Sequence, residues 1–304
     1  MSVRHFLTLL DLSPEELRAV IQRAQELKAL RSQGVRPAIF SNQVLAMIFD
    51  KSSTRTRVSF ESAMVESGGA AIFLSPRDTQ LGRGEAIADT ARVLSRMCDA
   101  IMVRTFSHDA AETLAKFSEV PVINGLTDSF HPCQLLADMQ TYFERRGDIK
   151  GRKVAWIGDG NNMCNSYINA AQQFGFALSI ATPIGYEPSQ FANVSSSVEL
   201  DYSHRPEQAV INADLVVTDV WASMGQENEA EKRHELFHRF QVSEALLSKA
   251  RSDVLFMHCL PAHRGEEVDA KVLEHPKSVV WDEAGNRLHA QKALLELLLH
   301  GTTG

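Results

Sequence analysis

The stretch VLAMIFDKSSTRTRVSFESAMV, residues 44–65, carries the strongest indication of the fold. Its first six residues are apolar without alternating polar positions, which predicts a strand covered on both faces. A turn rich in hydroxyl and basic side chains follows at 51–57, and an apolar helix is expected at 58–66. A buried strand that runs through a short turn into a helix is the repeating unit of an α/β protein.

The same alternation recurs along the chain. Short apolar runs predict strands at 44–49, 71–74, 100–103, 120–123, 153–157, 178–181, 215–218, 254–257 and 279–281. Apolar residues three and four positions apart predict helices at 14–31, 85–97, 134–146, 166–174 and 244–250. We therefore expect α/β architecture with mainly parallel sheets flanked by helices.

The chain of 304 residues is long enough for about two domains of ~100–200 residues each. A long amphipathic helix ends in charge and glycine near 147–152, and a fresh buried strand then begins a second series. We expect two similar-sized domains, at 1–148 and 149–304. The last helix, about 283–300, is expected to return to the first domain.

Composition excludes several classes of protein. Thirty-eight acidic and 31 basic residues give a net charge of −7, which argues against a general nucleic-acid binder. No apolar run approaches the ~20 residues that span a bilayer, and residues 1–17 lack the core of a signal peptide. Cys98, Cys133, Cys164 and Cys259 lie far apart without a CxxC pair, which favours reduced thiols and a cytoplasmic location.

The turn at 51–57 combines four hydroxyl side chains with two arginines at the start of a helix. Free backbone N–H groups at such a position favour an anion, and arginine adds a bidentate fork for phosphate. A helix cap with two solvated arginines would need only one of these hydroxyls. The density of donors therefore favours an anion site.

Further polar residues follow the predicted strands of the first half. Arg104 comes after AIMV, HPCQ at 131–134 opens the next helix, and Gln80 lies in the loop SPRDTQLGRGE. A single histidine before a helix is more often a cap or a core residue than a catalyst. Together these side chains supply donors suited to a carbonyl and a phosphate, at the strand ends where ligands bind in parallel sheets.

The segment GDGNN at 158–162 resembles the start of a dinucleotide fingerprint, but Met163 stands at the third glycine position. We therefore do not expect NAD here. Asn162 either caps the helix or holds a carboxylate. Asp219 ends another strand and is placed to pair with an amine, while SMG at 223–225 is either a ligand-closing turn or an ordinary loop.

The strand VLFM leads into HCLPAHRG at 258–265. Cys259 invites a nucleophile hypothesis, but the sequence shows no nearby acid–histidine arrangement, so covalent catalysis is a minority interpretation. A metal site formed by His258, Cys259 and His263 is also weakly indicated. The proline between these residues disturbs a regular helical spacing of ligands.

Taken together, the motifs are specific. STRTR at 53–57 and HPCQ at 131–134 resemble the carbamoyl-phosphate signatures of the aspartate/ornithine carbamoyltransferase family. SMG at 223–225 and HCLP at 258–261 resemble the ornithine branch in particular. The aspartate branch uses a lysine in the earlier mobile loop, where this chain has Gln80 and no lysine. The similarity runs in the same order over essentially the whole chain.

The resemblance implies a role for each matching residue. Carbamoyl phosphate would be held by Ser53, Thr54, Arg55, Thr56, Arg57, Gln80, Arg104, His131, Gln134, Cys259, Leu260 and Arg287. Ornithine would be held by Asn162, Asp219, Ser223 and Met224. The catalytic residues would be Arg104 and His131, which with Thr56 polarise the carbonyl oxygen, and Cys259, which positions the δ-nitrogen.

The resemblance further implies transfer of a carbamoyl group to the δ-amine of ornithine, giving citrulline and phosphate in arginine biosynthesis. It implies no cofactor, no metal ion, and a homotrimer with shared active sites in which Gln80 reaches the adjacent subunit. One alternative is a related transferase acting on an acylated ornithine or putrescine. Another is a non-catalytic protein that binds a phosphorylated metabolite. Asp219 favours an acceptor with a free α-amino group.

Overall fold

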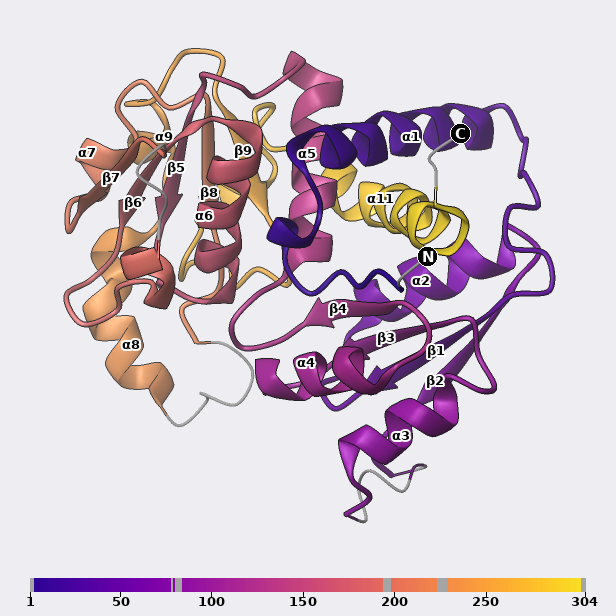
Figure 1. Ribbon diagram of the computed structural model, residues 1–304. Coiled ribbons are helices and arrows are strands. Elements are labelled where there is room, and N and C mark those ends of the chain that lie inside the picture. Colours follow the sequence, from indigo (N-terminus) through magenta and orange to yellow (C-terminus); the bar gives the residue numbers. More distant parts are fainter. Residues whose placement is uncertain (1–2, 78, 80–83, 194–197, 223–228, 302–304) are drawn as a thin grey trace. The chain divides into compact units, whose positions relative to one another are not determined.

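The computed structural model describes residues 3–77, 79, 84–193, 198–222 and 229–301 (Figure 1). The predicted site residues Gln80, Ser223 and Met224 lie outside the described residues. The chain divides into two compact units. Unit 1 comprises Met1–Gln140 and Gly285–Gly304, and unit 2 comprises Thr141–Ala284. The predicted domain bounds, 1–148 and 149–304, and the ligand that each domain binds remain predictions.

Unit 1 is built on a four-stranded parallel sheet in the order β2-β1-β3-β4. Its strands are β1 (Val44–Phe49), β2 (Ala70–Leu74), β3 (Ala100–Arg104) and β4 (Val122–Leu126). Its helices are α1 (Pro14–Ser32), α2 (Thr54–Val65), α3 (Ile87–Leu94), α4 (His108–Phe117), most of α5 (Pro132–Arg146) and most of α11 (Val280–His300). The predicted parallel α/β architecture is confirmed for this unit.

Helices cover both faces of the first sheet, as its continuous apolar strands require. Ala91 of α3 and Leu114 of α4 pack against Ile101 and Val103 of β3 on one face. Figure 1 shows α1, α2 and α11 on the other side of the sheet from α3 and α4. Because the helices cover the faces of the sheet, the turns that the sequence analysis singled out follow the carboxyl ends of β1, β3 and β4.

The last helix returns to the first domain, as predicted. Residues of α11 from position 285 onward belong to unit 1. Glu296 accepts a 2.8 Å hydrogen bond from Arg23 of α1, and Lys292 forms an ion pair with Glu66 at 3.3 Å. Both pairs are largely buried, so the helix is fixed to the unit that carries the STRTR turn.

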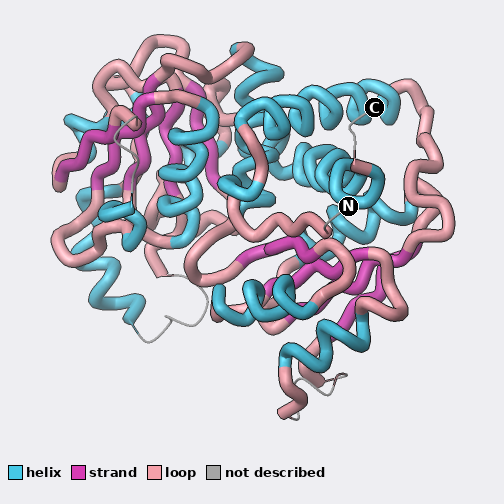
Figure 2. Tube along the Cα trace, viewed as in Figure 1, coloured by secondary structure: helices cyan, strands magenta, loops and turns pink. Residues whose placement is uncertain are grey.

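Unit 2 is a second unit of strands and helices (Figure 2), a parallel sheet with the strand order β7-β6-β5-β8-β9 (Figure 1). Its strands are β5 (Lys153–Ile157), β6 (Ala177–Ala181), β7 (Leu200–Ser203), β8 (Leu215–Thr218) and β9 (Leu255–His258). Its helices include α6 (Asn162–Phe174), α7 (Pro206–Ala209), α8 (Ala230–Phe237), α9 (Glu244–Leu247) and α10 (Ala270–Leu273). Every strand pair is parallel.

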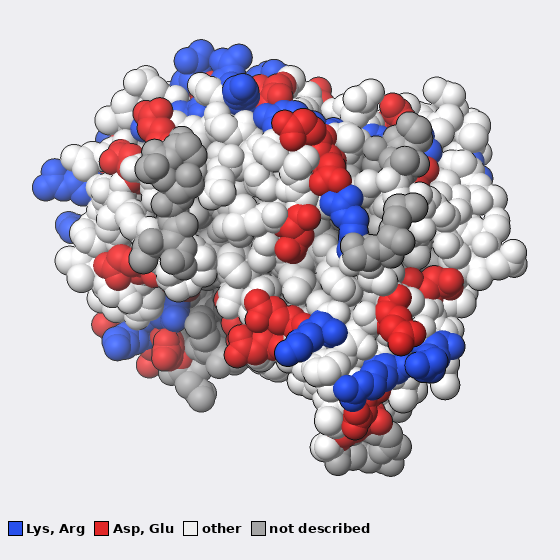
Figure 3. Space-filling view, viewed as in Figure 1, with Lys and Arg blue, Asp and Glu red and all other residues white. Residues whose placement is uncertain are grey.

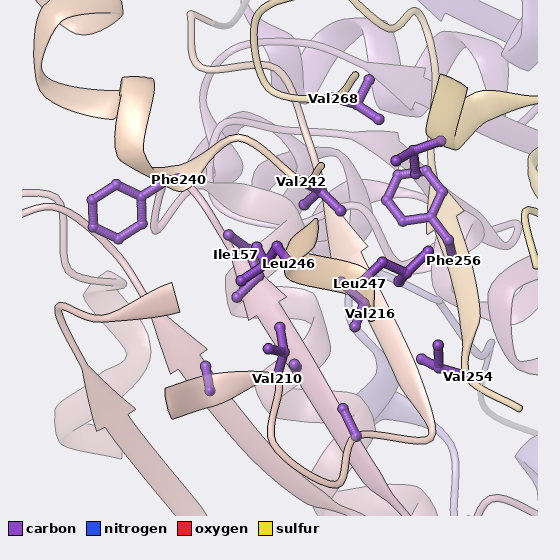
Figure 4. Packing of buried hydrophobic residues seen from close by; sticks show 14 of the residues in the cluster. Ile157, Val210, Val216, Phe240, Val242, Leu246, Leu247, Val254, Phe256 and Val268 are labelled. Atoms are coloured by element: carbon purple, nitrogen blue, oxygen red, sulfur yellow. The ribbon is translucent and has the colours of Figure 1, made fainter. Parts of the chain in front are cut away.

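The core of unit 2 lies between its sheet and the short helices α7, α9 and α10 (Figure 4). Ile157, Val216 and Phe256 come from three neighbouring strands, and Val210 and Leu247 from the covering segments. Each buried side chain of this size contributes roughly 1.5–3 kcal/mol when it leaves water. This packing fixes the strand ends, and therefore the turns that follow them.

Two strand assignments differ from the sequence-based expectation, and α2 begins at Thr54 rather than at 58, so residues 54–57 form its first turn. The strand predicted at 279–281 is wrong: only Ser278 forms an isolated bridge, with Phe256, and α11 begins at Val280. Asp282 and Glu283 in the first turn favour a helix there, because acidic groups stabilise a helix N-terminus. Strand β7 was missed, because the edge sequence LDYS is partly exposed and weakly apolar.

The surface carries no single basic field among the described residues on the face shown in Figure 3, where acidic and basic side chains are interspersed. Within the described part of the chain, no helix is both long and apolar enough to cross a membrane. The four cysteines, all of them described, form no disulfide.

Candidate active site

The N-terminus of α2 is capped by Ser53, whose Oγ accepts a hydrogen bond from Thr56 N at 3.2 Å. Serine is favoured at this position because its hydroxyl satisfies an N–H that has no carbonyl partner within the helix. Thr54 is exposed and Arg55 half-buried at the same turn. The first N–H groups of a helix and its dipole favour a phosphate at this point.

Arg287 of α11 joins the three helices that surround the turn in unit 1. Its Nη2 donates to Thr56 Oγ1 at 3.3 Å and its Nη1 donates to Gln134 Oε1 at 2.6 Å. With its amide oxygen facing the guanidinium, Gln291 accepts from Arg287 Nε at 3.0 Å. Gln134 also donates to Asp138 Oδ1 at 2.9 Å, so the orientation of its amide is determined on both sides.

His131 lies at the start of α5 and is buried with Arg104 at the end of β3. Burial holds the pKa of His131 well below its usual range, and the positive charges of Arg287, Arg104 and Arg55 lower it further. The imidazole is therefore neutral at pH 7 and can donate through one ring nitrogen. Arg55, Arg104, His131 and Arg287 thus lie close enough to interact electrostatically within unit 1.

Arg57 differs from the other predicted phosphate ligands. Its guanidinium pairs with Glu61 at 3.4 Å and lies 3.9 Å from the centre of the Phe73 ring. Its side chain is 47% exposed, whereas Arg104 and Arg287 are buried. The structure therefore assembles Arg55, and not Arg57, with the cluster around His131.

Unit 2 brings a second set of predicted residues together at the ends of β5, β8 and β9. The carboxylate of Asp219 accepts from Asn161 Nδ2 at 2.8 Å, from Val220 N at 2.8 Å and from Cys259 Sγ at 3.1 Å. Asn161 caps α6 by accepting from the N–H groups of residues 163 and 164. Asn162, which the sequence favoured, is the first residue of the helix and lies beside this cap.

The backbone at Cys259–Leu260 is held by a buried histidine. His258 Nδ1 accepts from Leu260 N at 2.9 Å, so its Nε2 carries the proton and donates to Glu267 Oε1 at 3.1 Å. Leu260 has a φ of 57°, a left-handed conformation that a side-chain-bearing residue rarely adopts. The hydrogen bond to His258 therefore stabilises an unusual backbone geometry beside Cys259.

The metal alternative is disfavoured by this arrangement. The predicted set of His258, Cys259 and His263 is not assembled as such: donor atoms of His258 and Cys259 lie within 4.8 Å of Asp219, whereas His263 groups with Glu266 and Glu267. However, both ring nitrogens of His258 are already engaged, one by Leu260 N and one by Glu267. A neutral histidine ligand needs a free nitrogen lone pair, so binding a metal here would break one of these buried contacts.

Several residues in or near the strand-end turns were not singled out from the sequence. Asn161 could have been found from its position just before a predicted helix, where asparagine is a favoured cap. Gln291 could have been found because it lies four positions after Arg287 on the same helix, where side chains contact each other. Lys51 pairs with Asp128 and lies 4.2 Å from the centre of the Phe106 ring. Such a pair carries no local sequence signal, because the partners are 77 positions apart.

These features define a class of protein. Unit 1 combines a helix terminus suited to phosphate with buried arginines and a neutral histidine, and unit 2 presents a carboxylate suited to an amine. This combination is typical of an enzyme that transfers a group from a phosphorylated carbonyl compound to an amine. The chain belongs to the aspartate/ornithine carbamoyltransferase family. The family's carbamoyl-P binding domain matches residues 4–144, and its Asp/Orn binding domain matches residues 150–298.

Two curated relatives and one solved structure illustrate the similarity. The chain is 64% identical to ornithine carbamoyltransferase of Nitrosococcus oceani over 99% of both chains. It is 61% identical to the anabolic ornithine carbamoyltransferase of Pseudomonas aeruginosa over 98% of both. The structure of ornithine carbamoyltransferase from Pyrococcus furiosus is 50% identical, with a TM-score of 0.94 over 99% of this chain and 98% of that one.

Proposed function

We propose that this chain transfers the carbamoyl group of carbamoyl phosphate to the δ-amine of L-ornithine, giving L-citrulline and phosphate in arginine biosynthesis. The observation that carries the proposal is the identity of 61–64%, over nearly the whole of each chain, to proteins named ornithine carbamoyltransferase, one of them designated anabolic. The chemistry of the two residue clusters is consistent with this reaction.

Unit 1 binds the phosphate of carbamoyl phosphate. The N-terminus of α2 supplies backbone N–H donors together with the hydroxyls of Ser53, Thr54 and Thr56, and Arg55 adds a charged fork. Arg287 is buried and already fixed by Thr56 and Gln134, so little reorganisation is needed when the substrate arrives. Pairing these charges with phosphate also stabilises it as a leaving group.

The carbonyl oxygen of carbamoyl phosphate lies towards Arg104, His131 and Thr56 in this proposal. Attack by the amine places negative charge on that oxygen, and donors that are already oriented stabilise it. A neutral His131 can donate without the cost of holding a fourth positive charge beside three arginines. Gln134 and the backbone at Cys259–Leu260 accept hydrogen bonds from the carbamoyl NH₂ group.

Unit 2 binds ornithine through Asn162, Asp219, Ser223 and Met224. The carboxylate of Asp219 pairs with the α-amino group, and Cys259 positions the δ-nitrogen. The neutral δ-amine attacks the carbonyl carbon and a C–N bond forms. The C–O bond to phosphate breaks, the electron pair leaves with phosphate, and the departing phosphate takes up the proton that the nitrogen loses.

The assembly that we propose is a cytoplasmic homotrimer with active sites shared between subunits, in which Gln80 reaches the neighbouring site. Large apolar side chains support an interface on unit 1. Val58 and Val65 on α2, Ile72 on the sheet-edge strand β2, and Val93 on α3 are each 46–62% exposed. Contiguous exposed apolar surface marks contact sites between proteins, and Val58 and Val65 lie one above the other on α2, which packs beside β2. Four cysteines without a disulfide are consistent with a reducing compartment.

A colorimetric citrulline assay with purified protein tests the reaction. Carbamoyl phosphate is supplied with L-ornithine, N-acetylornithine, N-succinylornithine or putrescine, and phosphate release is measured in parallel because it reports carbamoylation of any acceptor. We expect rapid turnover with L-ornithine alone. Preferential phosphate release with an acylated ornithine or putrescine would transfer the assignment to the related transferase. No turnover with any amine, despite binding of carbamoyl phosphate, would contradict an enzymatic function.

A further inference from the structure

Arg233 of α8 connects two loops of unit 2 that carry the amino-acid-binding cluster. Its Nη1 donates to Asp159 Oδ2 at 2.8 Å and to the carbonyl oxygen of Trp221 at 2.8 Å. Its Nε donates to Glu229 Oε2 at 3.1 Å, and its guanidinium lies 4.9 Å from the centre of the Tyr186 ring. Arg233 and Asp159 are both buried.

The two loops that Arg233 joins end at the same carboxylate. Asp159 lies two residues before Asn161 in the turn after β5, and Trp221 lies two residues after Asp219 at the end of β8. Asn161 donates to Asp219 at 2.8 Å, which closes the connection. A change at Arg233 would therefore shift Asn161 and Asp219 relative to each other.

The turn after β5 is also fixed from its other side. A Cβ on Gly160 would lie 2.4 Å from Pro188 N and 2.5 Å from Tyr186 O, so the two backbones are in direct contact. Gly160 N donates to Tyr186 O at 2.9 Å. Trp156 Nε1 holds the carbonyl oxygen of Asp159 at 2.9 Å, and Arg233 holds its carboxylate.

The pair has features of a functional rather than a stabilising contact. Burial raises the pKa of Asp159 to about 6 even though Arg233 acts to lower it. Desolvation therefore outweighs attraction, and the ionised carboxylate costs stability at neutral pH. A buried pair with this balance, next to a predicted binding cluster, is more simply explained by positioning than by stability.

We propose that Arg233, through Asp159 and the Trp221 carbonyl, is a positioning residue that sets the geometry of Asp219 and Asn161 for the α-amino group of the acceptor amino acid. This inference rests on the proposed function. Arg233 acts through these partners and does not touch the reacting atoms. Loss of its contacts should weaken binding of ornithine while leaving carbamoyl phosphate, which unit 1 binds, unaffected.

Steady-state kinetics of R233Q, R233K and K232Q test the proposal, with thermal melting of each protein. Lys232 is exposed on the same helix, so K232Q removes an equal charge without touching the loops. We expect R233Q to raise the KM for ornithine at least tenfold, with the KM for carbamoyl phosphate within threefold of the wild type. R233K keeps the charge but offers a single nitrogen, so it should recover part of the affinity for ornithine.

The outcomes separate the two proposals. A wild-type protein that makes no citrulline contradicts the proposed function, irrespective of Arg233. An active wild type with folded R233Q whose KM for ornithine rises less than tenfold overturns the positioning role. An equal rise in both KM values, or a loss of folding in R233Q without recovery in R233K, would assign Arg233 a general structural role and also overturn it. K232Q should behave as the wild type in each measurement.

Discussion

His131 is the residue whose chemistry depends most on its surroundings. Burial alone would lower its pKa, and the charges of Arg287, Arg104 and Arg55 act in the same direction. A protonated imidazole at this position would be desolvated and repelled by three cations. The histidine is therefore retained as a neutral hydrogen-bond donor, which suits a carbonyl oxygen that gains negative charge.

Replacement of His131 by phenylalanine should lower kcat by about 10²–10³, because one preorganised donor to a developing oxyanion is lost. A change of similar size in kcat/KM for carbamoyl phosphate would follow if the interaction forms only in the transition state. Stopped-time citrulline assays across pH 6–9 measure both constants. A kcat within threefold of the wild type would contradict a role for His131 in catalysis.

Arg55 and Arg57 provide a matched pair within one turn. Arg55 is half-buried and lies near His131, whereas Arg57 is exposed and contacts Glu61 and Phe73. We expect R55A to weaken binding of carbamoyl phosphate by about tenfold or more, since charged hydrogen bonds to phosphate are worth roughly 1.5–3 kcal/mol. R57A should change it much less. Calorimetric titration of both variants with carbamoyl phosphate measures the two affinities. Equal losses of affinity would show that Arg57 also binds the phosphate.

Asp159 predicts an unusual dependence of stability on pH. Its pKa is about 6 in the folded protein, whereas the usual value of 3.8 applies to the unfolded chain. The folded state therefore binds the proton more tightly than the unfolded chain does. Its ionisation therefore reduces the free energy of unfolding by about 2–3 kcal/mol above pH 6, and this penalty fades as the pH falls from 6 towards 4.

Urea unfolding of the wild type and D159N at several pH values between 4 and 7.5 tests this expectation. The wild type should gain stability relative to D159N as the pH falls through 6, because only the wild type carries the titrating group. The comparison removes the contribution of other carboxylates, which are common to both proteins. A stability difference that is constant over this range would show that the pKa of Asp159 is not raised.

At the scale of elements, the start of α2 has both a structural and a proposed functional role. Ser53 caps α2, and Ser107 caps α4 in the same way, by accepting from Ala110 N at 3.3 Å. S53A and S107A should each lower the free energy of unfolding by about 1 kcal/mol. Only S53A should also weaken binding of carbamoyl phosphate, as measured by calorimetry. Loss of affinity in both variants would mean that helix stability, not the hydroxyl, controls binding.

At the scale of the whole molecule, the proposed trimer can be tested through the exposed apolar side chains of unit 1. V58E and V65E place a charge on the outer face of α2, which should dissociate the proposed trimer and lower activity, because in that proposal Gln80 completes the site of a neighbouring subunit. Ile184, which is 78% exposed in unit 2, provides the control I184E. Sedimentation velocity measures the mass, and an unchanged trimer in both α2 variants would place the interface elsewhere.

Most of the architecture followed from local patterns. Continuous apolar runs predicted eight of the nine strands in the described residues, because parallel strands buried on both faces do not alternate with polar residues. The failure at 279–281 has a local cause as well: a short apolar run is compatible with a strand or with the first turn of a buried helix. The edge strand β7 was missed because none of its four residues is fully buried, so its sequence lacks a continuous apolar run.

The sequence by itself determined the parallel α/β class and the motifs at the strand ends, because these depend on hydrophobic period and on the chemistry of neighbouring residues. Only the tertiary structure decided that Arg287 orients Gln134, that Arg55 rather than Arg57 joins the cluster around His131, and that Arg233 holds Asp159. Such pairings connect residues far apart along the chain. Their geometry and their pKa values are set by burial and by neighbours from other elements, which no local pattern encodes.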